Sequence, residues 1–408
     1  VKTFTINVSN ANEAPVLSAP ATLTVNEDST LNAVSGVSFT DSDDFGQVEE
    51  ITLDLGASPK GTITLGTTTG LTFSTGDGTA DTKMVFTGTK AALNAALASL
   101  TFTPTANINT VGGGNEQPLA ITVNDQGNTG GGAQTDTKTV LITVTPVNDA
   151  PTHTAPGTTA VSLSVSEDTP EASVPGDTVA NLYATLFSDA TDQVTGGSDA
   201  NMLAGVAIYS NNATTHGTWQ YSTDGGANWI NLPVVSLNNA FVVAASDKLR
   251  FLPAPDWNGG APSIEASLID GSGGPVTTAT NLDLTAPGAT GGTTAVSDSA
   301  NRVYLDVWIA PLNDAPTATG SATLPAIDED TANPPGAAVS SLITGANYSD
   351  ATDQVSPTTW GNSSATPLGG IAIVGNTANA GTEGAWQYST DGGGTWTAVP
   401  ASGLGDSS

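Results

Sequence analysis

The stretch Asn148-Asp149-Ala150-Pro151 is a boundary that this sequence repeats. The other copies read Asn12-Glu13-Ala14-Pro15 and Asn313-Asp314-Ala315-Pro316. Each copy directly follows a run of alternating apolar and polar residues, which is the pattern of a β-strand, and a proline there stops further strand pairing. Each boundary is therefore the exit from a β domain. The spacings of 136 and 165 residues suit whole domains and are too long for solenoid repeats.

Acidic features follow each boundary in a fixed order. A Glu-Asp pair comes first, and an acidic turn comes next. The pairs lie at 27–28, 167–168 and 329–330, and the turns at 41–44, 189–193 and 350–354. Later, the first two copies each have an acid-Gly turn after a strand, with Asp125 and Asp270. The shared order indicates one domain type in successive copies.

The boundaries divide the chain into four parts. Residues 1–14 are expected to be the last strand of a preceding domain and its linker. Residues 15–150 and 151–315 are predicted as two complete β-sandwiches. Residues 316–408 are predicted as a third, truncated sandwich, because the sequence ends at Ser408 before the late features recur.

Strand signals dominate inside the domains, as at residues 62–65, 84–87, 206–209 and 282–284. The one helix that the pattern predicts spans about residues 90–100, with leucines at 93, 97 and 100 on one face. Short strands separated by Gly, Asn and Asp turns are typical of immunoglobulin-like sandwiches. The predicted fold class is all-β, with tandem sandwich domains in a linear array.

The composition excludes several classes of function. The chain has 8 Lys and Arg against 39 Asp and Glu, for a net charge of −31, so it would repel nucleic acid and anionic membrane surfaces. It has no cysteine, which excludes thiolate metal sites, and no stretch long and apolar enough to insert in a membrane. No Ser/His/Asp arrangement is visible, and acids that recur by domain behave as structural parts, so we expect no enzyme activity.

The boundary string, followed by Ser166-Glu167-Asp168-Thr169, resembles the cadherin-like tandem repeats of giant bacterial surface adhesins, which often carry RTX-type repeats. It is also similar to the Asp-x-Asn-Asp-x linker of animal cadherins. Glu13 departs from that pattern but keeps a carboxylate, and the Asp-x-x-Asp turns of the later copies depart from Asp-x-Asp. The resemblance covers essentially the whole chain. It implies an extracellular, cell-surface or secreted location and calcium ions between neighbouring domains of the same chain.

Calcium takes six to eight oxygen ligands, which carboxylates and Asn side chains supply. The predicted ligands are Glu27, Asp41, Asp43, Asp125, Asn148, Asp149, Glu167, Asp189, Asp192, Asp270, Asn313, Asp314, Asp350 and Asp353. The resemblance places Asp125 at the middle boundary and Asp270 at the last one. The expected function is a calcium-rigidified spacer or stalk segment of a bacterial adhesin.

Three other interpretations stay open. The acids could be turn and cap residues, since Asp and Asn hydrogen-bond their own backbone. The segments at 217–226 and 384–393, Gly-x-Trp-Gln-Tyr-Ser-Thr-Asp-Gly-Gly, fit structural hairpins, but exposed aromatics there would favour recognition of glycans or of another copy. A surface-filament or surface-layer subunit would instead present a self-complementary apolar patch or an exchanged strand.

Overall fold

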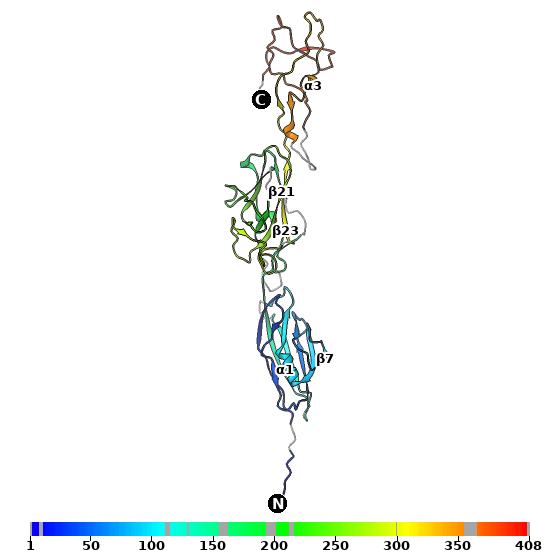
Figure 1. The fold of residues 1–408 in the computed structure, drawn as a ribbon, viewed down its shortest axis with the longest axis vertical. Helices are drawn as coiled ribbons and strands as arrows, with labels where there is room; N and C mark the ends of the chain where they lie inside the picture. Colours follow the sequence, from blue (N-terminus) through cyan, green and yellow to red (C-terminus); the bar gives the residue numbers. More distant parts are fainter. Residues whose placement is uncertain are drawn as a thin grey trace.

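The computed structural model describes residues 2–7, 11–110, 115–128, 130–154, 162–192, 201–211, 216–298, 300–354 and 365–405. Three parts follow one another along the long axis of the molecule (Figure 1). The first two parts are β-sandwiches, so the prediction of an all-β chain with sandwich domains in a row is confirmed. No helix in the described ranges has the length and apolar character that crossing a membrane requires.

The first sandwich has a six-stranded sheet in the order β2-β11-β10-β5-β8-β7, a three-stranded sheet β3-β9-β6 and a short β1–β4 ladder. Its elements are β1 (Val16–Ser18), β2 (Thr22–Asn26), β3 (Asn32–Ala33), β4 (Ser38–Thr40), β5 (Val48–Asp54), β6 (Gly61–Leu65), β7 (Leu71–Thr75), β8 (Lys83–Thr89), α1 (Lys90–Ala98), β9 (Leu100–Pro104), β10 (Gln117–Asn124) and β11 (Thr135–Thr145). Alternate residues of β5, β8 and β10 are buried, as the period of two requires.

Helix α1 confirms the predicted helix, although Leu100 belongs to strand β9. Thr89 caps its N-terminus by accepting a hydrogen bond from the backbone of Ala92, and Leu93 and Leu97 are buried in the core. Asn94 bonds both the N–H and the C=O of Phe39, at 2.9 and 3.0 Å. These contacts fix α1 against β4 and the acidic turn that follows β4.

The second sandwich has a six-stranded sheet β13-β23-β21-β16-β19-β22, a four-stranded sheet β14-β20-β17-β18 and a β12–β15 ladder. Its elements are β12 (Thr152–His153), β13 (Ser162–Ser166), η1 (Glu171–Ser173), β14 (Asp177–Thr178), α2 (Val179–Tyr183), β15 (Phe187–Ser188), β16 (Leu203–Ser210), β17 (Gly217–Ser222), β18 (Ile230–Asn231), β19 (Ala240–Ala244), β20 (Lys248–Pro253), β21 (Gly259–Asp270), β22 (Asn281–Leu282) and β23 (Arg302–Ala310). Buried aromatics such as Trp219 and Phe251 fill the core between the sheets.

The second sandwich is longer because of one connection. Residues 271–301 join β21 to β23, whereas residues 125–134 join the corresponding strands β10 and β11. The longer connection contributes Val296 to a small second core with Tyr209 and Val242, on the outer face of the sheet. This connection therefore accounts for most of the wider boundary spacing.

Two parts of the chain differ from the prediction. Residues 2–7 were predicted as a strand, but they pair with no strand in the described part of the chain, and Phe4 is 89% exposed. A strand forms only where its backbone groups find hydrogen-bond partners. The described part of 316–408 forms only two-residue ladders rather than a sandwich. Its elements are β24 (Thr317–Ala318), α3 (Val339–Leu342), β25 (Tyr348–Ser349), η2 (Ala351–Gln354), β26 (Gln387–Tyr388) and β27 (Thr397–Ala398). The described part of 316–408 has no counterpart of β20, β21 or β23, and its two-residue ladders enclose no core.

Candidate metal sites at the sandwich ends

Strand pairing decides at which end of a sandwich each acid lies. Strand β2 runs parallel to β11 with Asn26 opposite Thr145, so Glu27 lies at the C-terminal end of the first sandwich. Strand β10 runs antiparallel to β5 with Asn124 opposite Glu50, so Asp125 lies at the N-terminal end. The same pairings recur in the second sandwich for Glu167 and Asp270.

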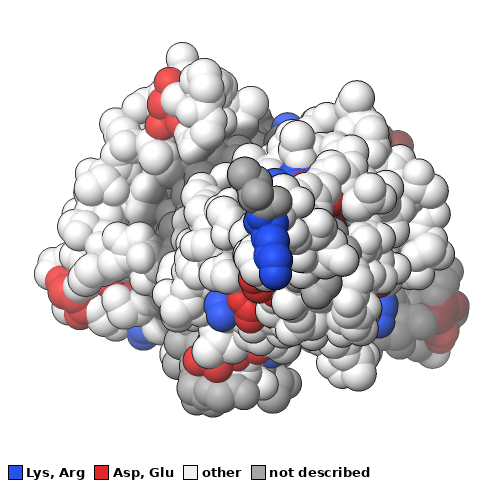
Figure 2. Space-filling model, turned by 90° about the horizontal axis from the view of Figure 1, so that it is seen from below, with Lys and Arg blue, Asp and Glu red and all other residues white. Residues whose placement is uncertain are grey.

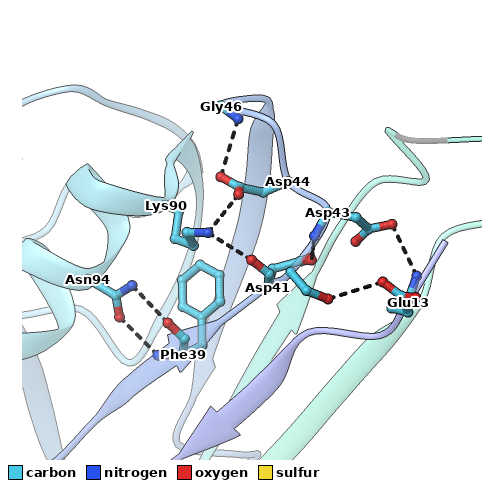
Figure 3. Close-up of polar contacts among 9 residues, drawn as sticks. Glu13, Phe39, Asp41, Asp43, Asp44, Gly46, Lys90 and Asn94 are labelled. Atoms are coloured by element: carbon cyan, nitrogen blue, oxygen red, sulfur yellow. Dashed lines mark hydrogen bonds and ion pairs between the residues drawn. The ribbon is translucent and has the colours of Figure 1, made fainter. Parts of the chain in front are cut away.

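The first cluster lies at the N-terminal end of the first sandwich, where side chains surround a small cavity. They are Asn12, Asp41, Asp43, Asp44, Glu49, Asp125 and Asn128. The Asn12 amide donates to Asp125 Oδ2 at 2.7 Å. The Glu13 backbone N–H donates to Asp43 Oδ2 at 3.2 Å (Figure 3). The first boundary and the acidic turn are thus joined.

Lys90 borders the first cluster from α1. Its Nζ donates to Asp44 Oδ1 at 2.6 Å and to the Asp41 carbonyl at 2.8 Å (Figure 3). The ion pair with Asp44 raises the pKa of Lys90, so the ammonium stays charged. One acid of the first cluster is therefore neutralised by the protein itself.

Glu49 is the most deeply buried acid of the first cluster, with 1% of its surface exposed. Among the described residues, no donor lies within hydrogen-bonding distance of either carboxyl oxygen, and the neighbouring Asp41 Oδ2 is in the same situation. Burial, and after it the adjoining Asp41 carboxyl, raises the pKa of Glu49 to about 8. Two such carboxyls are stable side by side only if they share a proton or a cation.

The second cluster surrounds the middle boundary and takes residues from both sandwiches. Its acids are Glu27, Asp149, Asp189, Asp192 and Asp270, together with the amide of Asn148. The backbone N–H of Val147 donates to Glu27 at 2.7 Å, and that of Asp149 donates to Asp192 at 2.9 Å. Two linker residues, separated by Asn148, thus bond to carboxylates of the two sandwiches.

Several buried carboxylate oxygens of the second cluster have no hydrogen-bond partner within the described ranges: Glu27 Oε2, Asp149 Oδ2 and Asp189 Oδ1. Burial raises the pKa of Asp149 to about 6, and the charges of Asp28, Asp192 and Glu27 add to the effect. Burial also raises the pKa of Asp189 to about 6, with Asp192 and Asp270 adding to it. Buried oxygens that only accept hydrogen bonds are positioned to bind a cation.

The third cluster, at the last boundary, repeats this geometry. The N–H of Leu312 donates to Glu167 Oε1 at 2.7 Å, and the N–H of Asp314 donates to Asp353 Oδ1 at 2.8 Å. Asp350 precedes Asp353 in the same turn, and the Asn313 amide donates to the neighbouring Asp314 carbonyl at 2.9 Å. Carboxylate oxygens of Asp168, Asp256 and Asp314 also lie within 4.8 Å of one another. Burial and then the charges of Asp168 and Asp256 raise the pKa of Asp314.

The predicted grouping of two acids is wrong. Asp125 was expected at the middle boundary, but it contacts Asn12 of the first boundary. Asp270 was expected at the last boundary, but it accepts from Asn148 of the middle one at 3.4 Å. Each of these strands ends beside the acidic turn of its own domain, so the late acid lies at the N-terminal end of that domain.

Four residues of these clusters were not predicted from the sequence. Asn258 donates from Nδ2 to both oxygens of Glu167 at 3.1 Å. The side chain of Asn109 lies beside Glu27 and offsets part of the rise in the Glu27 pKa that burial causes. Both asparagines follow the Pro of a Leu-x-Phe-x-Pro strand by five residues, so their equal spacing was a usable signal. Asp256 lies in the same loop as Asn258. Glu49 also had a usable signal, because the period of two places it on the same face of the strand as Ile51 and Leu53.

The donor sets fit a hard divalent cation such as Ca²⁺. Every side chain that could bind it directly offers oxygen, as carboxylate or as amide. The Asp-x-x-Asp turns of the later copies make the same contact with the linker as the Asp-x-Asp turn of the first copy. In all three, the second acid (Asp43, Asp192 or Asp353) accepts the N–H of the linker acid.

The Trp-Gln-Tyr segment of the second sandwich forms the expected hairpin, with β17 paired to β18. Trp219 and Tyr221 are buried, and Ser222 and Asp224 hold the turn through a 2.8 Å hydrogen bond. In the third part, the corresponding Trp386 is 53% exposed, because the core that would cover it is absent there. The buried pair favours a structural role for the hairpin.

Figure 2 shows the charge on the face at the N-terminal end. Most of this face is neither acidic nor basic, and its acids lie in separate patches.

No protein-family model and no curated protein matches the chain. Among solved structures, it is similar to EC22–24 of mouse cadherin-23, with 14% identity and a TM-score of 0.36, over 76% of this chain and 71% of that one. It is also similar to EC1–4 of PcdhgB3, with 11% identity and a TM-score of 0.28, over 74% of this chain and 55% of that one. AggA, the major subunit of aggregative adherence fimbriae type I from Escherichia coli, gives 15% identity and a TM-score of 0.20, over 35% of this chain and 100% of that one. Identity and TM-score are low in all three cases, and the fold class rests on the strand pairing described above.

Proposed function

We propose that this chain is a calcium-rigidified spacer or stalk segment of an extracellular bacterial adhesin. The observation that carries the proposal is the second cluster, where buried carboxylate oxygens from both sides of one linker have no hydrogen-bond donor. A cation there would hold the two sandwiches together.

The physical argument is the repulsion between the acids. Two carboxylates about 5 Å apart repel each other by roughly 3 kcal/mol at an effective dielectric constant of about 20. The second cluster brings together five acids and, in the described residues, no Lys or Arg bonds to them. Without a cation these charges favour separation of the sandwiches, whereas a cation that binds only the closed arrangement stabilises it by mass action.

On this proposal, residues 15–150 and 151–315 are two calcium-linked domains, and residues 316–408 carry part of the next one. The role is mechanical and involves no catalysis. Clusters that recur at each boundary support this, because a rod needs one lock per junction whereas a catalytic site occurs once.

The experiment is thermal unfolding of the full chain in calcium, in magnesium and in chelator. Calcium should raise the midpoint by several degrees or more and magnesium much less, because Mg²⁺ demands a tighter octahedral shell. All seven Trp residues lie beyond residue 150, so Trp fluorescence follows the second sandwich and the third part, while calorimetry also follows the first sandwich. An unchanged midpoint would leave the acids as turn residues.

A recognition module is the second candidate, and the half-exposed Trp386 and Trp396 favour it. Of their counterparts in the second sandwich, Trp219 is covered by core packing, and Trp229 is half-buried with Arg250 over its ring at 4.3 Å. A glycan array or a self-association assay that responds to Trp386→Ala in the presence of calcium would support recognition over the stalk role.

A further inference from the structure

We propose that Glu49 is a direct ligand of a divalent cation in the first cluster, completing a site with Asp41, Asp43 and Asp125. The inference rests on the proposed function and deepens it by naming a ligand outside the repeated pattern. On this proposal the first cluster takes its carboxylates from one sandwich, whereas the second cluster takes them from two.

The geometry around Glu49 carries the inference. Glu49 is the second residue of β5, close to the acidic turn, and lines the same cavity as Asp41, Asp43 and Asp125. Both of its oxygens and Asp41 Oδ2 are buried without a donor among the described residues. Three such oxygens at one cavity match the needs of a cation that is coordinated only by oxygen.

The corresponding position in the second sandwich cannot coordinate a cation. Continuing the β5–β10 register by one residue places Glu49 opposite Asp125, and residues opposite each other in an antiparallel pair share a face. In the second sandwich, Leu203 lies opposite Asp270. The second cluster instead draws Glu27 and Asp149 from the preceding sandwich and the linker.

The first site therefore takes its four carboxylates from one sandwich. The second site needs two successive sandwiches. Lys90, paired with Asp44 at the border, should oppose the cation and lower the affinity of the first site. The two sites should accordingly fill independently of each other.

Hydrogen exchange of the full chain, measured by mass spectrometry over a calcium titration, tests this at each cluster separately. Glu49→Gln should raise the calcium needed to protect residues 38–50 and 121–128 by about tenfold or more, as expected when a metal shell is disturbed. Protection of the second cluster should stay unchanged. Glu50→Gln is the matched control, because it removes the same charge one residue away on the opposite face of β5. Lys90→Gln should lower the calcium concentration needed to protect the first cluster.

The effect of Glu49→Gln on the melting temperature should also change sign between chelator and calcium. In chelator it should melt at or above the wild-type temperature, since it removes a buried repulsion, and in calcium it should melt below the wild type. A merely structural Glu49 would lower both. If Glu49→Gln does not fold, Glu49→Asp keeps the charge, shortens the reach and should likewise weaken protection of the first cluster.

The outcomes separate the two proposals. If calcium protects the second cluster but Glu49→Gln responds like the wild type at the first, the Glu49 assignment is wrong and the stalk proposal stands. If calcium protects no cluster in the wild type, the proposed function itself is wrong.

Discussion

At the scale of single residues, the molecule is defined by carboxylates that are buried without donors. Asp192 is one of the acids that connect the linker to the next sandwich, through its 2.9 Å hydrogen bond from the Asp149 N–H. Its equivalents at the other two boundaries make the same contact. The repeated contact indicates that one geometry serves three junctions.

Replacing Asp192 by Asn should weaken calcium binding at the second cluster by at least about tenfold, since the metal shell loses a carboxylate. The measurement is the calcium dependence of Trp fluorescence on thermal unfolding. Asp77→Asn, in an exposed turn of the first sandwich, changes the net charge equally and should leave the curve unchanged. Equal curves for both variants would argue against a metal role for Asp192.

The raised pKa values predict how stability depends on pH without calcium. Asp149 and Asp189 have folded pKa values of about 6, and Glu49 of about 8, all above their ordinary values near 4. These groups stabilise the fold only while protonated, so their contribution is complete below about pH 4 and is lost as the pH rises through 6 and then 8. In chelator the melting temperature should therefore fall between pH 5 and pH 8, and saturating calcium should remove that fall. A flat profile in chelator would show that the acids are solvated.

At the scale of elements, the same hairpin has different energetic importance in its two copies. In β17, Trp219 is 2% exposed and packs edge-on against Phe251 at 5.1 Å. Trp386, directly before β26, is half exposed, and the described residues of the third part form no core cluster that covers it. The burial of an element, rather than its sequence, decides how much it stabilises the molecule.

Trp219→Ala should therefore destabilise the second sandwich by about 3–5 kcal/mol, the usual cost of emptying a buried Trp site. Trp386→Ala is the matched variant and should cost less than about 0.5 kcal/mol, as expected of a surface change. Denaturant unfolding followed by circular dichroism measures both. Similar costs would mean that the third part has a core of its own.

At the scale of the whole molecule, the parts lie in a row and the acidic clusters lie at their ends (Figure 1). The linker at the middle boundary is short and its backbone donates to both neighbours. These backbone hydrogen bonds orient the linker relative to both sandwiches. The repulsion between the buried carboxylates determines whether that orientation is stable.

Small-angle scattering of the full chain should give a longer maximum dimension and a narrower distance distribution in calcium than in chelator. Screened repulsion at high salt is the control, because salt weakens repulsion without bridging the sandwiches. If high salt in chelator reproduces the calcium profile, the junctions are held by screening rather than by bound metal.

Local signals were enough to predict most strands, helix α1 and the boundary turns, because the period of two, the helical leucine spacing and the Asn-acid-Ala-Pro turns can be read over a few residues. The sequence also identified most of the acids that gather at the ends. Which acids share a cluster depends on long-range strand pairing. Asn12 meets Asp125 across 113 positions because β10 ends beside the start of β5, and pairing over such a distance has no local signature. The period of two places Glu49 on the buried face of β5, but only the pairing of β5 with β10 brings it to the cavity beside Asp125.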